Sequence, residues 1–327
     1  MQKILVTGGA GFIGSNFIRY ALNHSDAQIT NIDALTYAGN ESSLSDLADH
    51  LRYQFIKVNL VNEEEVEAAF SEPYDLIIHF AAESHVDRSI LDAGSFINTN
   101  ILGTHQLLKK VLEGKASKMI HVSTDEVYGS LNVGDEAFTE STPIAPNNPY
   151  AASKASSDLF VQAFHHTYQV PVMITRCSNN YGPYQHPEKL IPTIIRKALK
   201  EEPIPLYGDG LNIRDWLFVE DHCRAIWNVA EKGKAGEVYN IGGNHEKTNL
   251  EVVKTILDYL KKDRSLITFV EDRLGHDRRY AINSSKIQQQ LGWQPETTFD
   301  EGLKKTIDWY VNNELWVRDV LKKDKQL

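Results

Sequence analysis

The chain of 327 residues contains only two cysteines, Cys177 and Cys223. Two thiols so far apart predict neither a disulfide framework nor a zinc site, and we expect no metal. No stretch approaches the ~18 uninterrupted apolar residues typical of a membrane-spanning helix. The first residues lack the basic region, apolar stretch and cleavage site of a signal peptide. The sequence therefore predicts a cytoplasmic protein in a reducing compartment.

Positive charge is also scarce. Thirty-four basic residues stand against 44 acidic ones, which gives a formal net charge of −10. Such a balance disfavours nucleic acid and anionic membranes as partners, so any phosphorylated ligand must be held by local groups. With 42% hydrophobic and 24% charged residues, the chain is long enough and apolar enough to bury a large core.

Short apolar runs alternate with helix-length segments along much of the chain. Strands are predicted at residues 3–7, 28–33, 53–58, 75–80, 118–123 and 170–175, and helices include 11–22 and 98–112. This order predicts the α/β class, with a Rossmann-type doubly wound parallel sheet.

The alternation breaks over 183–211 and again after Gly243, whereas residues 237–241 can return to the sheet as a further strand. We therefore predict a smaller, mostly helical C-terminal lobe with helices at 250–260 and 301–320. Residues 1–182, joined by 213–243, are expected to form the cofactor domain. Residues 183–212 and 244–327 are expected to form the substrate lobe.

A glycine-rich turn follows the first predicted strand and opens a helix. Gly8, Gly9, Gly11 and Gly14 fit the dinucleotide-binding pattern, in which glycines let a pyrophosphate approach the helix N-terminus. Asp33 ends the second predicted strand, at the spacing expected for a carboxylate on the adenosine ribose. A carboxylate there repels a 2′-phosphate, so the pattern favours NAD over NADP. The alternative interpretation is that the glycine turn binds no ligand and only allows the helix to pack on the sheet.

Polar residues also follow the fourth predicted strand, after Phe80, Ala81 and Ala82. Small alanines at this sheet edge allow a flat cofactor to lie close. Residues 83–85, Glu-Ser-His, are either part of the site or an ordinary polar loop. For Asn98, a helix-capping role is favoured over a functional one.

The fifth predicted strand ends in Ser123, Thr124, Asp125 and Glu126. Polar groups buried without partners at a cleft cost about 1–3 kcal/mol each, which suggests that these have a use. The alternative is a solvated cap of a short helix.

Tyr150 and Lys154 lie four residues apart, and therefore on one face of the helix that opens after Pro149. An ammonium beside a phenol favours the phenolate, so the pair is expected to act as a general base near neutral pH. The two carboxyls upstream offer a second acid and base, which an enzyme that only moves a hydride does not need.

Together these motifs carry a resemblance to a known family. The segments are 7–14 (TGGAGFIG), 81–89 (AAESHVDRS), 123–129 (STDEVYG), 150–154 (YAASK), 176–183 (RCSNNYGP) and 273–280 (RLGHDRRY). The chain resembles the extended short-chain dehydrogenase/reductase superfamily, and within it the nucleotide-sugar 4,6-dehydratases, from Met1 to about Trp316. The Asp125-Glu126 pair is specific to the dehydratases, because related 4-epimerases usually have small residues there.

The resemblance implies an NAD-dependent lyase that converts dTDP-glucose to its 4-keto-6-deoxy product plus water, in deoxysugar and most commonly rhamnose biosynthesis. NAD would be tightly bound and recycled. By this resemblance Tyr150 deprotonates the sugar 4-hydroxyl while Thr124 hydrogen-bonds the same oxygen. Lys154 holds the phenolate and the nicotinamide ribose. Glu126 removes the C5 proton and Asp125 protonates the departing 6-hydroxyl.

The resemblance also implies two sets of binding residues. For the cofactor they are Gly8, Gly11, Phe12, Ile13, Gly14, Asp33, Leu35, Thr36, Asn59, Leu60, Phe80, Ala81, Ala82, Ser84, Thr99, Tyr150, Lys154 and Asn180. For the nucleotide sugar they are Ser84, Thr124, Asn179, Lys189, Leu190, Pro205, Tyr207, Arg214, Asn249, His276, Arg279 and Tyr280.

Some points stay open at this stage. Arg214 and Arg279 can fork onto a diphosphate, whereas Arg273 and Arg278 are either ligands or ordinary surface residues. Family members often have Asp-Ile where this chain has Asn59-Leu60, and an asparagine can still hold adenine. The alternative functions are a 4,6-dehydratase or 4-epimerase acting on another nucleotide sugar, and a silent NAD-sensing regulator. The resemblance also implies a homodimer, with helices 98–112 and 150–168 as candidates for its interface.

Overall fold

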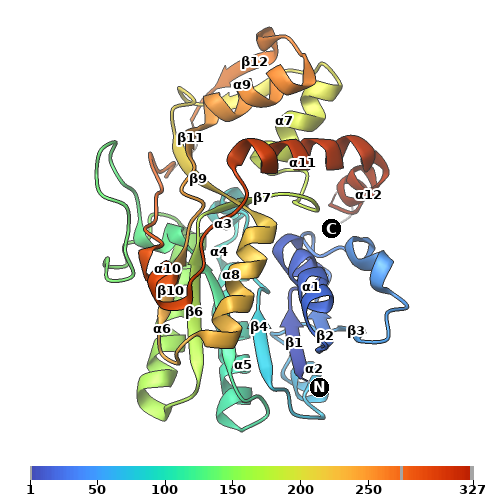
Figure 1. The fold of residues 1–327 in the computed structure, drawn as a ribbon, viewed down its shortest axis with the longest axis vertical. Coiled ribbons are helices and arrows are strands. Elements are labelled where there is room, and N and C mark those ends of the chain that lie inside the picture. The colour runs from blue at the N-terminus through green and yellow to red at the C-terminus, as the bar shows by residue number, and fades with distance from the viewer. Residues whose placement is uncertain (1, 273–274, 325–327) are drawn as a thin grey trace.

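The computed structural model describes residues 2–272 and 275–324. Its centre is a seven-stranded sheet in which every neighbouring pair is parallel, in the order β10-β6-β5-β4-β1-β2-β3 (Figure 1). The strands are β1 (Lys3–Thr7), β2 (Gln28–Asp33), β3 (Tyr53–Lys57), β4 (Leu76–His79), β5 (Met119–Thr124), β6 (Val172–Cys177) and β10 (Val238–Ile241). The predicted parallel sheet is confirmed, including the return of the strand near residue 240.

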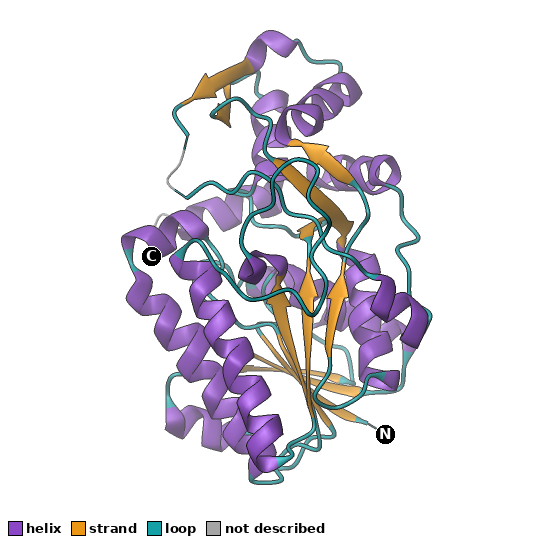
Figure 2. Ribbon diagram, turned by 90° about the vertical axis from the view of Figure 1, so that its left-hand side faces the viewer, coloured by secondary structure: helices purple, strands orange, loops and turns teal. Residues whose placement is uncertain are grey.

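Helices cover both faces of this sheet (Figures 1 and 2). Consecutive residues of β1 show why: Ile4 and Val6 belong to one buried cluster, while Leu5 belongs to another. The first cluster includes residues of α1 (Phe12–His24), α8 (Val219–Lys232) and α10 (Ser285–Leu291). The second includes residues of α2 (Glu63–Ala69), α5 (Gly103–Leu112) and α6 (Pro149–Tyr168). Strands buried on both faces carry continuous apolar runs.

A smaller lobe lies beyond the carboxyl ends of the strands, at the top of Figure 1. It contains a three-stranded sheet of β7 (Asn179–Tyr181), β9 (Ile213–Phe218) and β11 (Glu246–Thr248), and a pair formed by β8 (Ile204–Tyr207) and β12 (Ile267–Val270). Its helices are α7 (Leu190–Leu199), α9 (Asn249–Leu260), α11 (Phe299–Asn312) and α12 (Glu314–Asp324). Trp216, Phe299 and Ile256 lie in its own hydrophobic core.

The predicted helix over 301–320 is wrong in one respect, because α11 ends at Asn312 and α12 begins at Glu314. The Asn312 and Asn313 side chains donate to the carbonyls of Asp308 and Trp309, at 2.8 Å each. Side-chain amides that bond the preceding turn compete with helix propagation. The break turns α12 back toward the sheet.

The helix predicted over 98–112 begins earlier, as α4 (Ala93–Phe96), and passes through a π-helical segment, Ile97–Leu102, before α5. Asp92 caps it by accepting from the backbone N–H groups of Gly94 and Ser95, at 3.0 and 3.4 Å. The capping role expected for Asn98 is therefore wrong. The π segment places Asn100 so that its side chain bonds the backbone of Glu83 and the Ser153 hydroxyl.

The remaining short elements are α3 (Val86–Leu91) and three 3₁₀ turns, η1 (Glu41–Leu47), η3 (Asp125–Tyr128) and η4 (Arg264–Leu266). None of the helices in the described ranges has both the length and the apolar character needed to cross a bilayer.

Candidate active site

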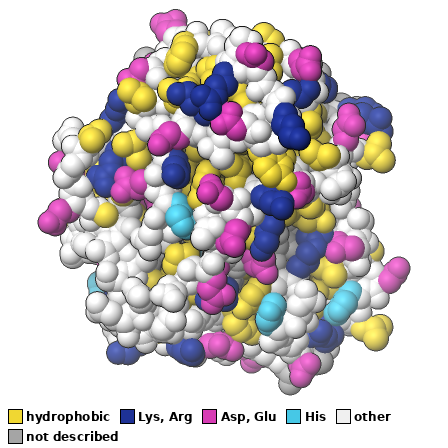
Figure 3. All heavy atoms as spheres, turned by 45° about the horizontal axis from the view of Figure 1, so that its top comes forward, with side chains coloured by type: hydrophobic (Ala, Val, Ile, Leu, Met, Phe, Trp, Pro, Cys, Tyr) yellow, Lys and Arg dark blue, Asp and Glu magenta, His cyan; other side chains and the backbone are white. Residues whose placement is uncertain are grey.

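A cavity of about 610 Å³ opens at the carboxyl ends of β1, β2, β4, β5 and β6. The strand order reverses at β1, which has β2 on one side and β4 on the other, and such switch points form the ligand crevice of open parallel sheets. On the molecular face in Figure 3, acidic and basic side chains are interspersed.

The glycine turn forms one wall of the cavity. Gly8 has φ +70°, and a Cβ there would lie 2.5 Å from the backbone nitrogen of Ala81. A Cβ at Gly14 would lie 2.4 Å from the Gly8 carbonyl oxygen. Gly11 is the N-cap of α1, and this helix has neither a side-chain cap nor an acidic residue in its first turn. The first backbone N–H groups of α1 are therefore suited to a pyrophosphate.

Asp33 lies at the end of β2 and is buried. Its two carboxylate oxygens accept from the backbone N–H groups of Ala10 and Leu35, at 3.0 and 2.8 Å. Burial raises the pKa of Asp33 above its ordinary value, and these two backbone donors oppose that shift. The carboxylate is thus fixed on the cavity wall in the position predicted for a ribose ligand.

All but one of the predicted cofactor residues line this cavity. Those that do are Gly8, Gly11, Phe12, Ile13, Gly14, Asp33, Thr36, Asn59, Leu60, Phe80, Ala81, Ala82, Ser84, Thr99, Tyr150, Lys154 and Asn180. The exception, Leu35, supports the site through its backbone N–H and has φ +55°.

Thr124, Asp125 and Glu126 lie where β5 passes into η3, and all three line the cavity. The Thr124 hydroxyl caps η3 by accepting from the Glu126 backbone N–H at 3.3 Å, so the capping interpretation is correct for Thr124. The Asp125 side chain does no capping and is only 2% exposed. Burial and, next, the nearby Glu126 raise the pKa of Asp125 well above its ordinary value, which favours the protonated form of this carboxyl.

Tyr150 and Lys154 lie in the first two turns of α6, where Asn148 caps the helix and accepts from the Ala151 N–H at 2.8 Å. Lys154 Nζ donates to the Val122 carbonyl at 2.8 Å. Burial first, and the charge of Glu126 next, raise the pKa of Tyr150 well above its ordinary value. The expectation that the Lys154 ammonium makes Tyr150 a base near neutral pH is therefore not met by the chain's own residues.

The predicted substrate residues divide into two groups. Ser84, Thr124, Asn179 and Lys189 line the cavity. The others lie outside its lining, in the smaller lobe and the segment after β12: Leu190, Pro205, Tyr207, Arg214, Asn249, His276, Arg279 and Tyr280. Among them the Tyr207 ring is 6.2 Å from the His276 ring, and the Arg214 guanidinium stacks 4.4 Å from the centroid of Tyr280.

The arginines near residue 278 are held in ion pairs. Arg279 forks onto the carboxylate of Glu246 at 2.6 and 2.8 Å, instead of facing the cavity as a diphosphate clamp. Arg278 pairs with Asp209 at 2.9 Å, as expected for an ordinary surface residue. Arg273 lies outside the described residues.

The sequence interpretation missed the contribution of the C-terminal helix. Trp316 and Val320 of α12 line the cavity, and Lys323 Nζ donates to the carbonyls of Leu35 and Thr36 at 3.1 Å each. Figure 1 shows α12 lying close to α1 and to the segment after β2. No local sequence pattern predicts that α12 contributes to the cavity, because the contact joins segments almost 300 residues apart.

Comparisons with known proteins agree with this geometry. A family model described as GDP-mannose 4,6 dehydratase matches residues 5–306. A dTDP-glucose 4,6-dehydratase from Neisseria meningitidis is 51% identical, over 98% of this chain and 96% of the relative. One from Escherichia coli K12 is 49% identical, over 98% and 95%.

Solved structures show the same relationship. The dTDP-glucose 4,6-dehydratase of Bacillus anthracis in complex with NAD has a TM-score of 0.91 and 50% identity, covering 98% of this chain and all of that one. A UDP-glucose 4-epimerase from Thermotoga maritima has a TM-score of 0.89 at 29% identity, covering 96% of this chain and 100% of that one. Fold and site thus define an NAD-type epimerase/dehydratase. The chain belongs to the GDP-mannose 4,6-dehydratase family.

Proposed function

We propose that this chain is an NAD-dependent hydro-lyase that converts dTDP-glucose to dTDP-4-dehydro-6-deoxy-glucose and water. One observation carries the proposal: Asp125 and Glu126 line the same cavity as Tyr150, next to the glycine turn. A hydride-transfer enzyme needs only the tyrosine. The two extra carboxyls supply the acid and base that an elimination requires.

NAD fits the cavity because the cradle of Gly8, Gly11 and Gly14 leaves room for a pyrophosphate, and because Asp33 is held ready for a ribose. When bound, NAD supplies a hydride acceptor and, in its oxidised form, a positive charge in the cavity. The chain's own residues keep the Tyr150 phenol neutral. Added positive charge lowers a phenol's pKa, so we expect Tyr150 to become a base only in the loaded enzyme.

In the oxidation step, Tyr150 takes the proton of the sugar 4-hydroxyl and Thr124 hydrogen-bonds the same oxygen. Lys154 lies one helical turn further along α6, where its ammonium supports the phenolate. The resulting 4-ketone makes the C5 proton acidic.

In the elimination step, Asp125 protonates the departing 6-hydroxyl and Glu126 removes the C5 proton. The direction of the Asp125 pKa shift supports this assignment, because a carboxyl with a raised pKa is better suited to give a proton than one with a lowered pKa. With NAD bound as acceptor of the C4 hydride, return of that hydride to C6 together with a proton to C5 would complete the product, so no net reductant would be consumed.

The smaller lobe is proposed to hold the nucleotide through Lys189, Tyr207, Arg214, Asn249 and the segment from His276 to Tyr280. Lys189 Nζ donates to the Ser84 carbonyl at 3.1 Å, so it already joins the two lobes at the cavity. The division into residues 1–182 with 213–243, and 183–212 with 244–327, belongs to this proposal with three exceptions: β7 and β9 pair with β11 in the smaller lobe, and α10 packs against the large sheet.

Incubation of the purified protein with dTDP-glucose, UDP-glucose, CDP-glucose, GDP-glucose and GDP-mannose tests the function. Mass spectrometry is expected to show loss of one water from the dTDP sugar, without net accumulation of NADH. A Lys154→Met variant provides the inactive control. Unchanged sugars in all five reactions would contradict the dehydratase assignment.

Two observations support alternative activities on another nucleotide sugar. The family model is named for a GDP-mannose enzyme, and one structural neighbour at 29% identity is a UDP-glucose 4-epimerase. If only GDP-mannose loses water, the substrate is GDP-mannose and not dTDP-glucose. Inversion at C4 without loss of mass, detected by NMR, would reassign the reaction.

A homodimer is also part of the proposal. The His105 ring of α5 lies 6.3 Å from Phe160 of α6, so these helices pack side by side. Helix α6 exposes Leu159 (54%) and Phe160 (43%), and Leu102 (47%), the last residue of the π segment before α5, is exposed as well. Exposed apolar residues on paired helices suit a twofold contact with a second copy. Light scattering is expected to give twice the chain mass for the wild type and the chain mass for Leu159→Asp.

We further infer a cytoplasmic location, consistent with the two free cysteines, Cys177 and Cys223. The product is proposed to feed deoxysugar synthesis, with rhamnose as the commonest outcome.

A further inference from the structure

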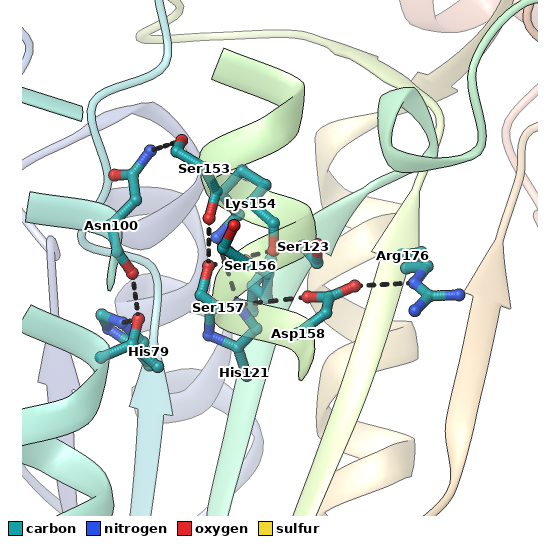
Figure 4. A network of polar contacts seen from close by, with 12 residues as sticks. His79, Asn100, His121, Ser123, Ser153, Lys154, Ser156, Ser157, Asp158 and Arg176 are labelled. Atoms are coloured by element: carbon teal, nitrogen blue, oxygen red, sulfur yellow. Dashed lines mark hydrogen bonds and ion pairs between the residues drawn. The ribbon is translucent and has the colours of Figure 1, made fainter. Parts of the chain in front are cut away.

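A group of ionisable side chains is buried between α6 and the strands β5 and β6, inward from the cavity (Figure 4). It consists of His121 of β5, Lys154 and Asp158 of α6, and Arg176 of β6, each at most 3% exposed. We refer to these four residues as the buried charge cluster. Only Lys154 reaches the lining of the cavity.

One imidazole nitrogen connects the two charges of α6. Lys154 Nζ lies 3.4 Å from Nε2 of His121, and the same Nε2 lies 3.4 Å from Oδ1 of Asp158. When Nε2 of His121 carries no proton, it can accept a hydrogen bond from the Lys154 ammonium. When Nε2 is protonated, its N–H faces the Asp158 carboxylate. Asp158 is thus linked to Lys154 through His121.

The far side of the carboxylate is fixed by Arg176. Its Nε donates to Oδ2 of Asp158 at 2.8 Å, and its Nη1 donates to the Tyr128 hydroxyl at 2.9 Å. Tyr128 in turn donates to Oδ1 of Asn240 at 2.8 Å. Arg176 therefore occupies one oxygen, while Oδ1 has no hydrogen-bond partner within the described ranges and faces His121.

Other titratable groups around Lys154 carry no charge. Burial and, next, the charge of Lys154 lower the pKa of His121 to about 4. His79 of β4 is buried, its pKa is lowered well below the ordinary value, and its two nitrogens bond the Thr7 and Thr104 hydroxyls at 2.7 and 2.9 Å. Burial raises the pKa of the Cys177 thiol of β6.

Asp158 is therefore the anion that supports Lys154. The pKa of Lys154 is lowered to about 8, and burial is the main cause. The charge of Asp158 is the largest influence that opposes this shift. Asp125 and Glu126 act instead on Tyr150. Without Asp158, the cluster would hold two buried cations, Lys154 and Arg176, and no anion.

Resting on the dehydratase function above, we propose that Asp158 is a positioning residue for Lys154, which acts through His121 to keep the ammonium charged and directed along the Tyr150 face of α6. Asp158 lies outside the lining of the cavity. Arg176 keeps this carboxylate ionised and turned toward the imidazole. The pairing of Asp158 with Arg176 is thus more than an internal support between α6 and β6.

The pH dependence of turnover tests this role. Asp158→Asn removes the negative charge, so Lys154 loses its proton at lower pH. We expect the alkaline limb of the kcat profile to move toward acid by about one pH unit or more, with KM for dTDP-glucose changed less than threefold. Asp158→Glu is expected to restore the position of the limb. A profile for Asp158→Asn that parallels the wild type at every pH would overturn the proposal.

A matched control is Asp221→Asn. Asp221 is also buried and pairs with an arginine, Arg224, at 2.9 Å, but it lies on α8. Its variant is expected to lose stability while keeping the shape of the pH profile. If Asp158→Asn does not fold, the double variant Asp158→Asn with Arg176→Met removes both charges of the pair. It must still move the alkaline limb toward acid.

A measurement without substrate separates this inference from the proposed function. The titration midpoint of Lys154 can be followed through its ¹³Cε resonance, assigned by its loss in Lys154→Met. The midpoint is expected to fall in Asp158→Asn and to stay unchanged in Asp221→Asn, whatever sugar the enzyme uses. An unchanged midpoint in both variants rejects the positioning role even if dTDP-glucose is turned over.

Discussion

Asp125 and Asp158 are both almost completely buried, yet their carboxyl pKa values are shifted in opposite directions. At Asp125, burial and the nearby Glu126 raise the carboxyl pKa well above its ordinary value. At Asp158, burial also raises it, but His121 and Arg176 outweigh burial and the pKa is lowered. Burial alone therefore does not decide the charge of a carboxyl. The hydrogen bonds and charges of its nearest partners do.

The difference assigns each carboxyl a task. A neutral carboxyl at the cavity can give a proton to a leaving hydroxyl, whereas an anion behind Lys154 can hold an ammonium in place. Exchanging the two environments would leave the site with no acid and the lysine with no counterion.

Changing the acid itself should have the largest effect on turnover. Asp125→Asn removes the transferable proton and is expected to lower kcat by about 10²–10⁴-fold. Steady-state turnover of dTDP-glucose measures this loss. Asp125→Glu, which keeps a carboxyl, is expected to retain more activity than Asp125→Asn. Equal activity in these two variants would contradict the acid role.

Glu126→Gln tests the carboxyl that raises the pKa of Asp125. Oxidation at C4 should continue while elimination fails, because no base takes the C5 proton. Kcat is expected to fall by about 10²–10⁴-fold while NADH absorbance accumulates on the enzyme. Normal turnover by this variant would show that another group removes the C5 proton.

The two aspartates should also affect stability with opposite sign. Breaking a buried pair typically costs about 3–5 kcal/mol, so Asp158→Asn is expected to lower the free energy of unfolding by that order at pH 7. Because its folded pKa is depressed, the contribution of Asp158 is present above its unfolded pKa and disappears as pH falls through its folded pKa. Urea unfolding of wild type and variant at pH 7 and pH 3 should show the difference shrinking in acid.

Asp125→Asn is expected to raise the Tm at pH 7 by a few degrees. A carboxyl with a raised folded pKa costs stability above its unfolded pKa, and that cost grows as pH rises toward the folded pKa. Calorimetry at pH 7 and at pH 3 checks the sign, because the gain should vanish in acid. A variant that is less stable than the wild type at pH 7 would contradict a raised pKa at Asp125.

Asp33 provides an intermediate case, with a raised pKa and a nearby cation, Lys323. Lys323→Met is expected to raise the pKa of Asp33 further and to weaken NAD binding by about three- to tenfold, which corresponds to about 0.6–1.4 kcal/mol. The loss should be greater at low pH, where Asp33 takes up its proton. Calorimetric titration at pH 5.5 and pH 8 measures it, with Lys322→Met as the control from the same helix.

Local chemistry explains which parts of the site could be predicted from sequence. Three features of the site depend only on residues close together in the sequence: the glycine turn, Asp33 and the Tyr150–Lys154 spacing. Each is positioned by a turn, a strand end or one face of a helix. The parallel sheet was predictable for the same reason, since short apolar runs such as those in β1 and β4 alternate with helix-length segments.

Long-range partners explain what could not be predicted. Arg279 has the chemistry of a diphosphate ligand, but it is paired with Glu246, 33 residues away. Trp316 reaches the cavity only because the chain breaks at Asn313. The protonation of Tyr150 and Asp125 depends on burial by segments that no local pattern reveals.

The sequence by itself determined the class of fold, the dinucleotide motif and the residues proposed to react, because each of these depends on short-range spacing. Only the tertiary structure decided which carboxyl is an acid and which is an anion. A pKa depends on solvent exclusion and on charges a few ångströms away, and residues from β5, α6 and β6 come that close only when the sheet has formed.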